Sequence, residues 1–221
     1  MNKKKAVLAA TLLSLSMILG ACGNSTSSNG KTANADVKKG VAPVADPEVA
    51  VIHMENSAAY GDITIELYSN IAPKMVERFK TLAKNGTYNG VTWHRVNQSV
   101  IQSGDPLSKD NDPKNDGTGK SDLPNVPAEF SDLKYDTGIV GAARGPDNNS
   151  ANSQFFITLK REQGFDNRYT IFGKVISGMN SAMLISGVQP KDGERPVEPI
   201  RIKNIEIVPA ASSAKWYNLE F

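Results

Sequence analysis

The feature that most constrains the fold is a series of short apolar runs separated by turn residues. In the run at 62–68, Ile63, Ile65 and Leu67 alternate with polar residues, which is the pattern of a strand with one buried face. Comparable runs occupy residues 49–54, 91–96, 100–103, 138–143, 155–159, 170–176 and 200–208. Many short strands joined by turns predict a mainly β fold, a closed antiparallel barrel.

Two segments have helical rather than strand-like spacing, so we expect two α-helices to cap the barrel. The first begins at Pro73, which suits the first turn of a helix, and ends before Asn85-Gly86. Its apolar residues recur at helical intervals, at Met75, Val76, Phe79, Leu82 and Ala83. The second helix has a weaker pattern and is expected over residues 179–186.

The last predicted strand changes face part-way along its length. Ile200 and Ile202 share one phase of the alternation, whereas Ile205 and Ile207 share the other. One extra residue near Asn204 would bring all four isoleucines to the same face. The sequence therefore predicts a β-bulge at that point.

The first residues are typical of an export signal. Three lysines precede an apolar run at 6–20, which is shorter than the roughly 20 residues of a membrane-spanning helix. The run leads into Leu19-Gly20-Ala21-Cys22, which resembles the lipobox of bacterial lipoproteins. The resemblance implies a signal peptide at 1–21, a lipid on Cys22 and an extracytoplasmic protein anchored to the bacterial cell membrane. The alternative is an ordinary signal peptide with a chance cysteine.

Composition divides the rest of the chain into a linker, a folded domain and a tail. Residues 22–47 are mostly small and polar, so we expect a lipidated, flexible linker there. The folded domain is expected over 48–208, and a tail that ends in aromatic residues follows at 209–221. Cleavage removes three of the 25 basic residues and no acidic one, which leaves a net charge of 22 − 23 = −1. No basic cluster remains, so we do not expect binding to nucleic acid. We also expect a monomer.

The residues that commonly bind metals are scarce. One cysteine and two histidines exclude an internal disulfide and leave little for a zinc site. The loop at 107–124 contains an oxygen-rich stretch at 110–117, but Pro113 and Lys114 interrupt it and its spacing is not that of an EF-hand. A solvated surface loop is therefore favoured over a calcium site.

Five motifs in register resemble those of the cyclophilin family of peptidyl-prolyl cis–trans isomerases. They are Ala72-Pro73-Lys74, Trp93-His94-Arg95-Val96, Ile101-Gln102-Ser103-Gly104-Asp105-Pro106, Ser153-Gln154-Phe155-Phe156-Ile157 and Phe172-Gly173-Lys174-Val175. The resemblance covers residues 48–208 and implies an eight-stranded barrel with two helices. It also implies isomerisation of X–Pro bonds without a metal or cofactor. The partners would be unfolded or newly secreted proline-containing polypeptides.

The same resemblance implies an active site around Arg95. It gives catalytic roles to Arg95, Gln102 and Phe156, and substrate-binding roles to Val100, Ala143, Arg144, Gln154, Phe165 and Tyr169. The sequence departs from the family where Gly164 replaces a tryptophan and Tyr169 replaces a histidine. The tryptophan matters for cyclosporin binding in the family. We therefore expect a pocket of different shape and weak sensitivity to that drug.

These residue types suit a reaction that breaks no covalent bond. An X–Pro amide resists rotation with a barrier of about 18–20 kcal/mol, because its nitrogen lone pair is delocalised into the carbonyl. In the twisted state the lone pair returns to nitrogen, so a fixed donor such as Arg95 stabilises that state more than the planar one. Arginine stays charged and holds its donors in a rigid fork. Phe156, with Val100 and Phe165, would seat the proline ring.

Two other classes of function are also open. A catalytically weak proline-peptide-binding module or chaperone could use the same barrel, given the changes at Ser99, Gly164 and Tyr169. A solute-binding lipoprotein of a transporter would share the anchor. It would need two domains and a cleft, for which a folded part of about 160 residues is short.

Overall fold

The computed structural model describes residues 36–110, 112–188, 190–191 and 193–211. The predicted signal peptide, Cys22, most of the predicted linker and residues 212–221 of the tail lie outside the described residues. Within the described part of the chain, none of the helices has the length and apolar character needed to cross a membrane.

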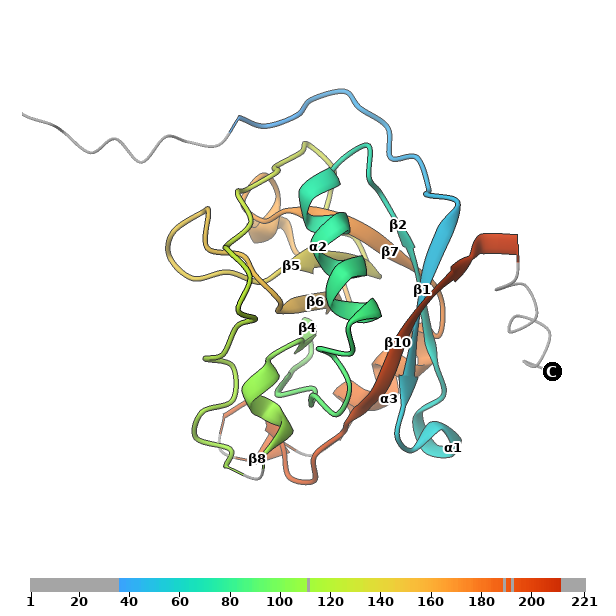
Figure 1. The fold of residues 1–221 in the computed structure, drawn as a ribbon, viewed down its shortest axis with the longest axis vertical. Helices are drawn as coiled ribbons and strands as arrows, with labels where there is room; N and C mark the ends of the chain where they lie inside the picture. Colours follow the sequence, from blue (N-terminus) through green and yellow to red (C-terminus); the bar gives the residue numbers. More distant parts are fainter. Residues whose placement is uncertain (1–35, 111, 189, 192, 212–221) are drawn as a thin grey trace, which may run out of the picture. The chain divides into compact units, whose positions relative to one another are not determined.

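Eight antiparallel strands form one curled sheet that carries the domain (Figure 1). The strands are β1 (Glu48–Met54), β2 (Ile63–Leu67), β3 (Arg95–Val96), β4 (Val100–Ser103), β5 (Ile139–Ala142), β6 (Phe155–Thr158), β7 (Ile171–Ser177) and β10 (Ile202–Pro209). Their order in space is β10-β1-β2-β7-β5-β6-β4-β3. The predicted mainly β class is confirmed, although the strand expected over 91–96 is reduced to the two residues of β3.

The expectation of a fully closed barrel is not confirmed. β10 and β3 are the two ends of the sheet, and no continuous ladder joins them in the described residues. The gap is crossed by one isolated bridge between Thr92 and Arg201. Three backbone hydrogen bonds of 2.8 to 2.9 Å also cross it, from Gly90 N to Ile202 O, from Ile202 N to Val91 O and from Trp93 N to Ile200 O. β3 pairs with β4 over two residues only, and the chain before it bonds to residues 200–202 at the start of β10.

Both predicted helices are present, and the structure adds a third, short one. α2 (Pro73–Lys84) and α3 (Met179–Ser186) lie where expected, whereas α1 (Ser57–Tyr60) was not expected. The sequence also gave no sign of the 3₁₀ turns η1 (Pro106–Lys109) and η2 (Gln163–Phe165), or of a hairpin of β8 (Pro190–Lys191) and β9 (Arg195–Pro196). Elements of two to four residues are too short to produce a measurable period.

The predicted bulge in the last strand is confirmed. His53 pairs with Asn204 and Met54 pairs with Ile202, so Lys203 is the extra residue of β10. Ile202 and Ile205 are both buried as a result, while Lys203 faces solvent. The extra residue keeps the isoleucines on both sides of it on the buried face of the sheet.

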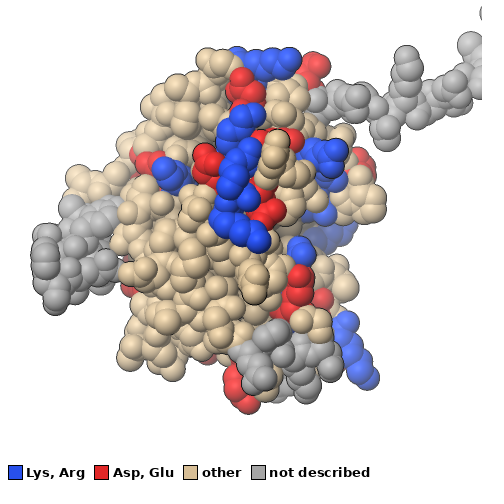
Figure 2. Space-filling view, turned by 180° about the vertical axis from the view of Figure 1, so that it is seen from behind, with Lys and Arg blue, Asp and Glu red and all other residues tan. Residues whose placement is uncertain are grey.

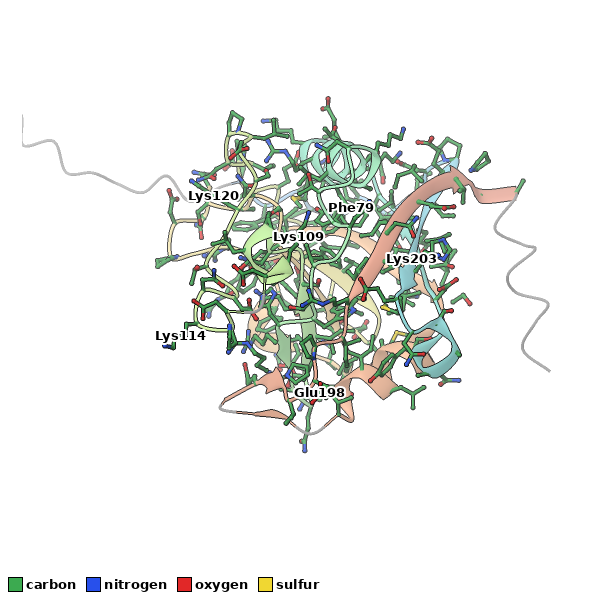
Figure 3. All side chains as sticks on the ribbon, turned by 60° about the horizontal axis from the view of Figure 1, so that its bottom comes forward. Phe79, Lys109, Lys114, Lys120, Glu198 and Lys203 are labelled. Atoms are coloured by element: carbon green, nitrogen blue, oxygen red, sulfur yellow. The ribbon has the colours of Figure 1, made fainter. Side chains whose placement is uncertain are left out.

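The sheet buries apolar side chains on both of its faces. The main core lies inside the curl and is covered by α2, whose Phe79 points inward against Tyr88, Phe155 and Phe172 with ring centroids 5.3 Å away in each case (Figure 3). A second, smaller cluster lies on the outer face of β5, β6 and β7 and includes Tyr135 and Phe156. This outer cluster is the foundation of the candidate site.

Residues 36–47, which we call the N-terminal strap, are bonded to the domain although the sequence predicted a flexible linker through residue 47. Lys38 Nζ donates to the carbonyl oxygens of Asn70 and Ile71 at 2.8 and 2.9 Å. Asp46 accepts from Lys80 Nζ at 2.7 Å, and both side chains are largely shielded from water. These contacts could not be predicted from the composition of the strap, because they join its polar groups to residues far along the chain.

Surface charges are mixed in sign. On the face opposite that of Figure 1, Lys and Arg side chains are interspersed with Asp and Glu side chains (Figure 2). The loop at 107–124 carries Lys109, Lys114 and Lys120 along one side of the domain (Figure 3). Among the described residues, no group of three or more His, Cys, Asp or Glu side chains is arranged to hold a metal ion.

Candidate active site

Three of the predicted site residues form one row across neighbouring strands. Arg95 on β3 pairs with Gln102 on β4, and Gln102 pairs with Phe156 on β6. Phe156 in turn pairs with Gly141 on β5. Directly paired residues of an antiparallel sheet project from the same face. The register therefore aligns a guanidinium, an amide and an aromatic ring on the outer face of the sheet.

The alternation of the strands separates the site from the core. Phe155 and Ile157 flank Phe156 and point inward, where both are fully buried in the main core. Phe156 belongs to the outer cluster and is 4% exposed. The two adjacent phenylalanines thus serve different faces, as the strand period requires.

Four aromatic rings form the apolar floor of the site. Phe156 contacts Tyr135, Phe165 and Tyr169 with ring centroids 5.7, 5.5 and 5.7 Å away. The Tyr135 ring is stacked on Phe156, whereas the other two meet it edge to face. Arg144 covers the outer ring of this set, because its Cζ lies 4.6 Å from the Tyr169 ring centroid.

The polar side of the site begins at Arg95, which forms an ion pair with Glu194. Its side chain is 45% exposed, so almost half of its surface is open to solvent. The bond from Arg95 lowers the pKa of the Glu194 carboxyl, and a second bond from Asn97 adds to the shift. Glu194 is therefore ionised at neutral pH.

Gln102 and Gln154 connect the row to a neighbouring loop. Gln102 Nε2 donates to Gln154 Oε1 at 2.9 Å. Gln154 Nε2 donates to the carbonyl oxygens of Gly117 and Gly119 at 3.0 and 2.8 Å. The two amides thereby fix the wall that the loop at 107–124 contributes.

His94 lies beneath this wall and is neutral. Burial lowers its pKa to about 4, and the nearby charge of Asp105 only partly offsets that effect. Its Nε2 lies 3.5 Å from Gln102 Nε2. The residue thus lines the pocket as an uncharged ring.

A pocket of about 370 Å³ opens over the row and the aromatic floor. It brings together eight of the predicted site residues: Arg95, Val100, Gln102, Ala143, Arg144, Phe156, Phe165 and Tyr169. The ninth, Gln154, lines an adjoining pocket of about 280 Å³ that shares Gln102, Gly117, Ala143 and Arg144. Cys22 lies outside the described residues.

Several residues that shape the site were not expected from the sequence. Asp116 and Gly117 line the pocket, Tyr135 backs its floor, and Glu194 holds Arg95. Only the loop at 107–124 had a recognisable feature in the sequence, because it is long and rich in polar residues. Tyr135 and Glu194 lie at the site because distant parts of the chain contact one another, and no local sequence pattern predicts such contacts.

A comparison with family profiles finds that the family described as "Cyclophilin type peptidyl-prolyl cis-trans isomerase/CLD" matches residues 51–207. The chain belongs to the cyclophilin family. It is therefore a peptidyl-prolyl cis–trans isomerase, and the row of Arg95, Gln102 and Phe156 lies in the matched region.

Curated relatives support the same assignment. The "Probable peptidyl-prolyl cis-trans isomerase" of Brucella suis is 43% identical over 145 residues, which are 63% of this chain and 72% of the relative. "Peptidyl-prolyl cis-trans isomerase ppi1" of Schizosaccharomyces pombe is 39% identical over 158 residues, which are 68% of this chain and 95% of the relative.

Solved structures of cyclophilins resemble this one in fold. A cyclophilin-type isomerase of Cryptosporidium parvum matches with a TM-score of 0.65 and 28% identity, over 73% of this chain and 97% of that chain. The structure of the same protein in the presence of the dipeptide Ala-Pro matches with a TM-score of 0.64 and 29% identity, over 72% and 98% of the two chains.

Proposed function

We propose that this cyclophilin accelerates X–Pro isomerisation in unfolded or newly secreted polypeptides outside the cytoplasm, while a lipid on Cys22 holds it at the cell membrane. The row of Arg95, Gln102 and Phe156 on one face of the sheet carries the proposal for the active site. The sequence Leu19-Gly20-Ala21-Cys22 after an apolar run supports the proposed location.

Arg95 is the proposed catalytic donor. In the twisted amide the nitrogen becomes a better acceptor, and a charged donor fixed beside it binds that state more strongly than the planar ones. Every tenfold of acceleration requires about 1.4 kcal/mol of such differential binding. A charge-assisted bond in a partly sheltered site can supply several tenfolds, and uncatalysed isomerisation takes roughly 10–100 s.

The aromatic floor is the proposed seat of the proline ring. Phe156, Val100 and Phe165 offer apolar contacts that are indifferent to the isomeric state, so they bind substrate without choosing between cis and trans. Gln102 is placed beside both the ring seat and Arg95, and it can hold a substrate carbonyl. Ala143, Arg144, Gln154 and Tyr169 border the two connected pockets and contact the flanking residues of the polypeptide.

The alternative is a proline-peptide-binding module with little turnover. The observation that favours it is the ion pair of Arg95 with Glu194, because an arginine engaged within the protein has fewer donors for a substrate. The glycine at position 164 also favours it, because a side chain there would have open space around it and the family's tryptophan is absent.

Substitution of Arg95 separates the two functions. We expect Arg95→Ala to lower kcat/KM for a proline tetrapeptide by about a hundredfold or more in a protease-coupled assay, with binding of the peptide retained. Lys174→Ala, which removes an exposed cation of β7 outside the pocket, serves as the matched control and should be fully active. Equal and near-background rates for the wild type and Arg95→Ala would favour the binding module.

The proposed anchor is tested separately. We expect Cys22→Ser to move the protein from the membrane fraction to the soluble extracellular fraction, because a stable anchor needs acyl chains that contribute roughly 0.8 kcal/mol per buried CH₂. Labelling with a radioactive fatty acid should be lost in the same variant. Unchanged membrane retention and unchanged labelling would overturn the proposed lipidation and leave the isomerase activity unaffected.

A further inference from the structure

Glu194 occupies a central position between the catalytic arginine and the turn that follows it. One carboxylate oxygen pairs with Nε of Arg95, and the other accepts from Asn97 Nδ2 at 2.5 Å. Both oxygens are therefore engaged on the same short stretch of chain, which holds β3 and the start of the β3–β4 turn.

Asn97 extends this contact to the far side of the pocket. Its Oδ1 accepts from the backbone nitrogens of Ser99 and Val100, each at 2.8 Å. Val100 lines the pocket and is one of the residues proposed to seat the proline ring. The Glu194 carboxylate thus fixes the donor directly and the seat through one intermediate side chain.

The backbone holds Glu194 in place. Val96 N donates to Glu194 O at 2.6 Å, which attaches the β8–β9 hairpin to β3. The next residue, Arg195, binds Asp116 through Nε at 3.0 Å, and Asp116 also lines the pocket. Two consecutive residues of the hairpin, Glu194 and Arg195, therefore bond to two residues that line the pocket, Arg95 and Asp116.

We propose that Glu194 is a positioning residue, which holds the Arg95 guanidinium in the orientation that the twisted amide requires, and that the β8–β9 hairpin is the support for this contact. The proposal rests on the catalytic role proposed for Arg95. It replaces the view that the ion pair only competes with the substrate, because the pair uses Nε and leaves the two terminal nitrogens as donors. Among the described residues, the Arg95 side chain has no hydrogen-bond acceptor besides Glu194.

Such support is needed because Arg95 is exposed. An arginine that is 45% exposed and unpaired would lose much rotamer freedom on meeting a substrate, and this loss would raise the barrier. A guanidinium that is already oriented through its Nε avoids that loss. A carboxylate serves this purpose better than a neutral amide, since charge-assisted bonds are shorter and stronger.

The test is a double-mutant cycle measured as kcat and KM. We expect Glu194→Ala to lower kcat by roughly tenfold with KM changed less than about twofold, because the bonds from Ser99 N and Val100 N to Asn97 Oδ1, which hold the proline seat, do not involve Glu194. Glu194→Gln, which keeps the length but loses the charge, should lie between Glu194→Ala and the wild type. In an Arg95→Ala background, Glu194→Ala should have no further effect on kcat.

Several outcomes decide the proposal. An unchanged kcat in Glu194→Ala, or a loss that is just as large in the Arg95→Ala background, would overturn the positioning role while leaving the catalytic role of Arg95 intact. Full activity of Arg95→Ala would instead refute the proposed role of Arg95. Glu198→Ala, which removes an exposed carboxylate four residues further on, is the matched control and should match the wild type (Figure 3). A thermal unfolding midpoint near that of the wild type shows that each variant is folded.

Discussion

Phe156 lies stacked on Tyr135, with the ring centroids 5.7 Å apart and the ring planes inclined by only 24°. Tyr135 is fully buried and does not line the pocket, so it acts on the substrate site through Phe156 and through Phe165, which its ring meets edge to face. The orientation of the floor of the pocket is therefore set from beneath, by a residue outside every motif that points to the family.

Gly141 is the position where this stack tolerates no added atom. A Cβ there would lie 2.6 Å from Tyr135 Oη and would also collide with the Phe156 ring. We expect Gly141→Ala to tilt Phe156, to lower the free energy of unfolding by about 1–3 kcal/mol and to raise KM. Urea unfolding and steady-state kinetics measure the two effects. Gly164→Ala, at a glycine with open space around its Cβ, should change neither, and an unperturbed Gly141→Ala would show that the rings can yield.

The hydroxyl of Tyr135 has no hydrogen-bond partner among the described residues, and burial raises the pKa of that group well above its usual range. Removing a buried, unbonded hydroxyl avoids a desolvation cost. We therefore expect Tyr135→Phe to leave kcat/KM within twofold of the wild type and to raise the free energy of unfolding by up to about 1 kcal/mol. Destabilisation by more than that amount in chemical denaturation would mean that the hydroxyl makes a bond.

Gly164 offers a route to drug binding. The position lies in η2 beside Phe165, and a side chain there would enter open space. We expect Gly164→Trp to restore the wall that the family uses for cyclosporin and to tighten binding of that drug by at least about tenfold, since a large aromatic ring adds substantial contact area. Calorimetric titration measures the change. Equal affinities of Gly164→Trp and Gly164→Ala would show that the altered wall at Tyr169 limits binding instead.

His94 makes stability depend on pH in the mildly acidic range. Its pKa is about 4 in the folded protein, mainly through burial, against 6.5 as its ordinary value. Between these values the unfolded chain binds a proton that the folded protein does not, so stability falls as the pH decreases from about 6.5 to about 4, by roughly 3 kcal/mol. We expect His94→Gln to reduce the difference between the free energies of unfolding measured by chemical denaturation at pH 7 and at pH 4.5. An equal difference in the wild type and in His94→Gln would show that other groups cause the pH dependence.

The sequence predicted those parts of the fold that leave a periodic or motif-based signal. α3 begins and ends at the predicted residues, and the bulge at Lys203 was visible as a change of phase between Ile202 and Ile205. The residues around the pocket followed from motifs that fix strand register.

Contacts between distant segments could not be predicted. Arg95 and Glu194 are 99 positions apart, and the hairpin that carries Glu194 has strands of two residues. Full closure of the barrel is not confirmed, because the pattern that marks a strand does not show whether its outer edge finds a partner.

The contacts of the N-terminal strap limit how far the domain could reach from the proposed anchor at Cys22. Because Lys38 is bonded to the domain, only residues 22–37 remain between the proposed lipid and the folded part. Such a segment reaches at most about 55 Å when fully extended. In the anchored form that we propose, this cyclophilin would therefore serve polypeptides close to the membrane surface, soon after they emerge, and would leave distant extracellular chains to isomerise unaided.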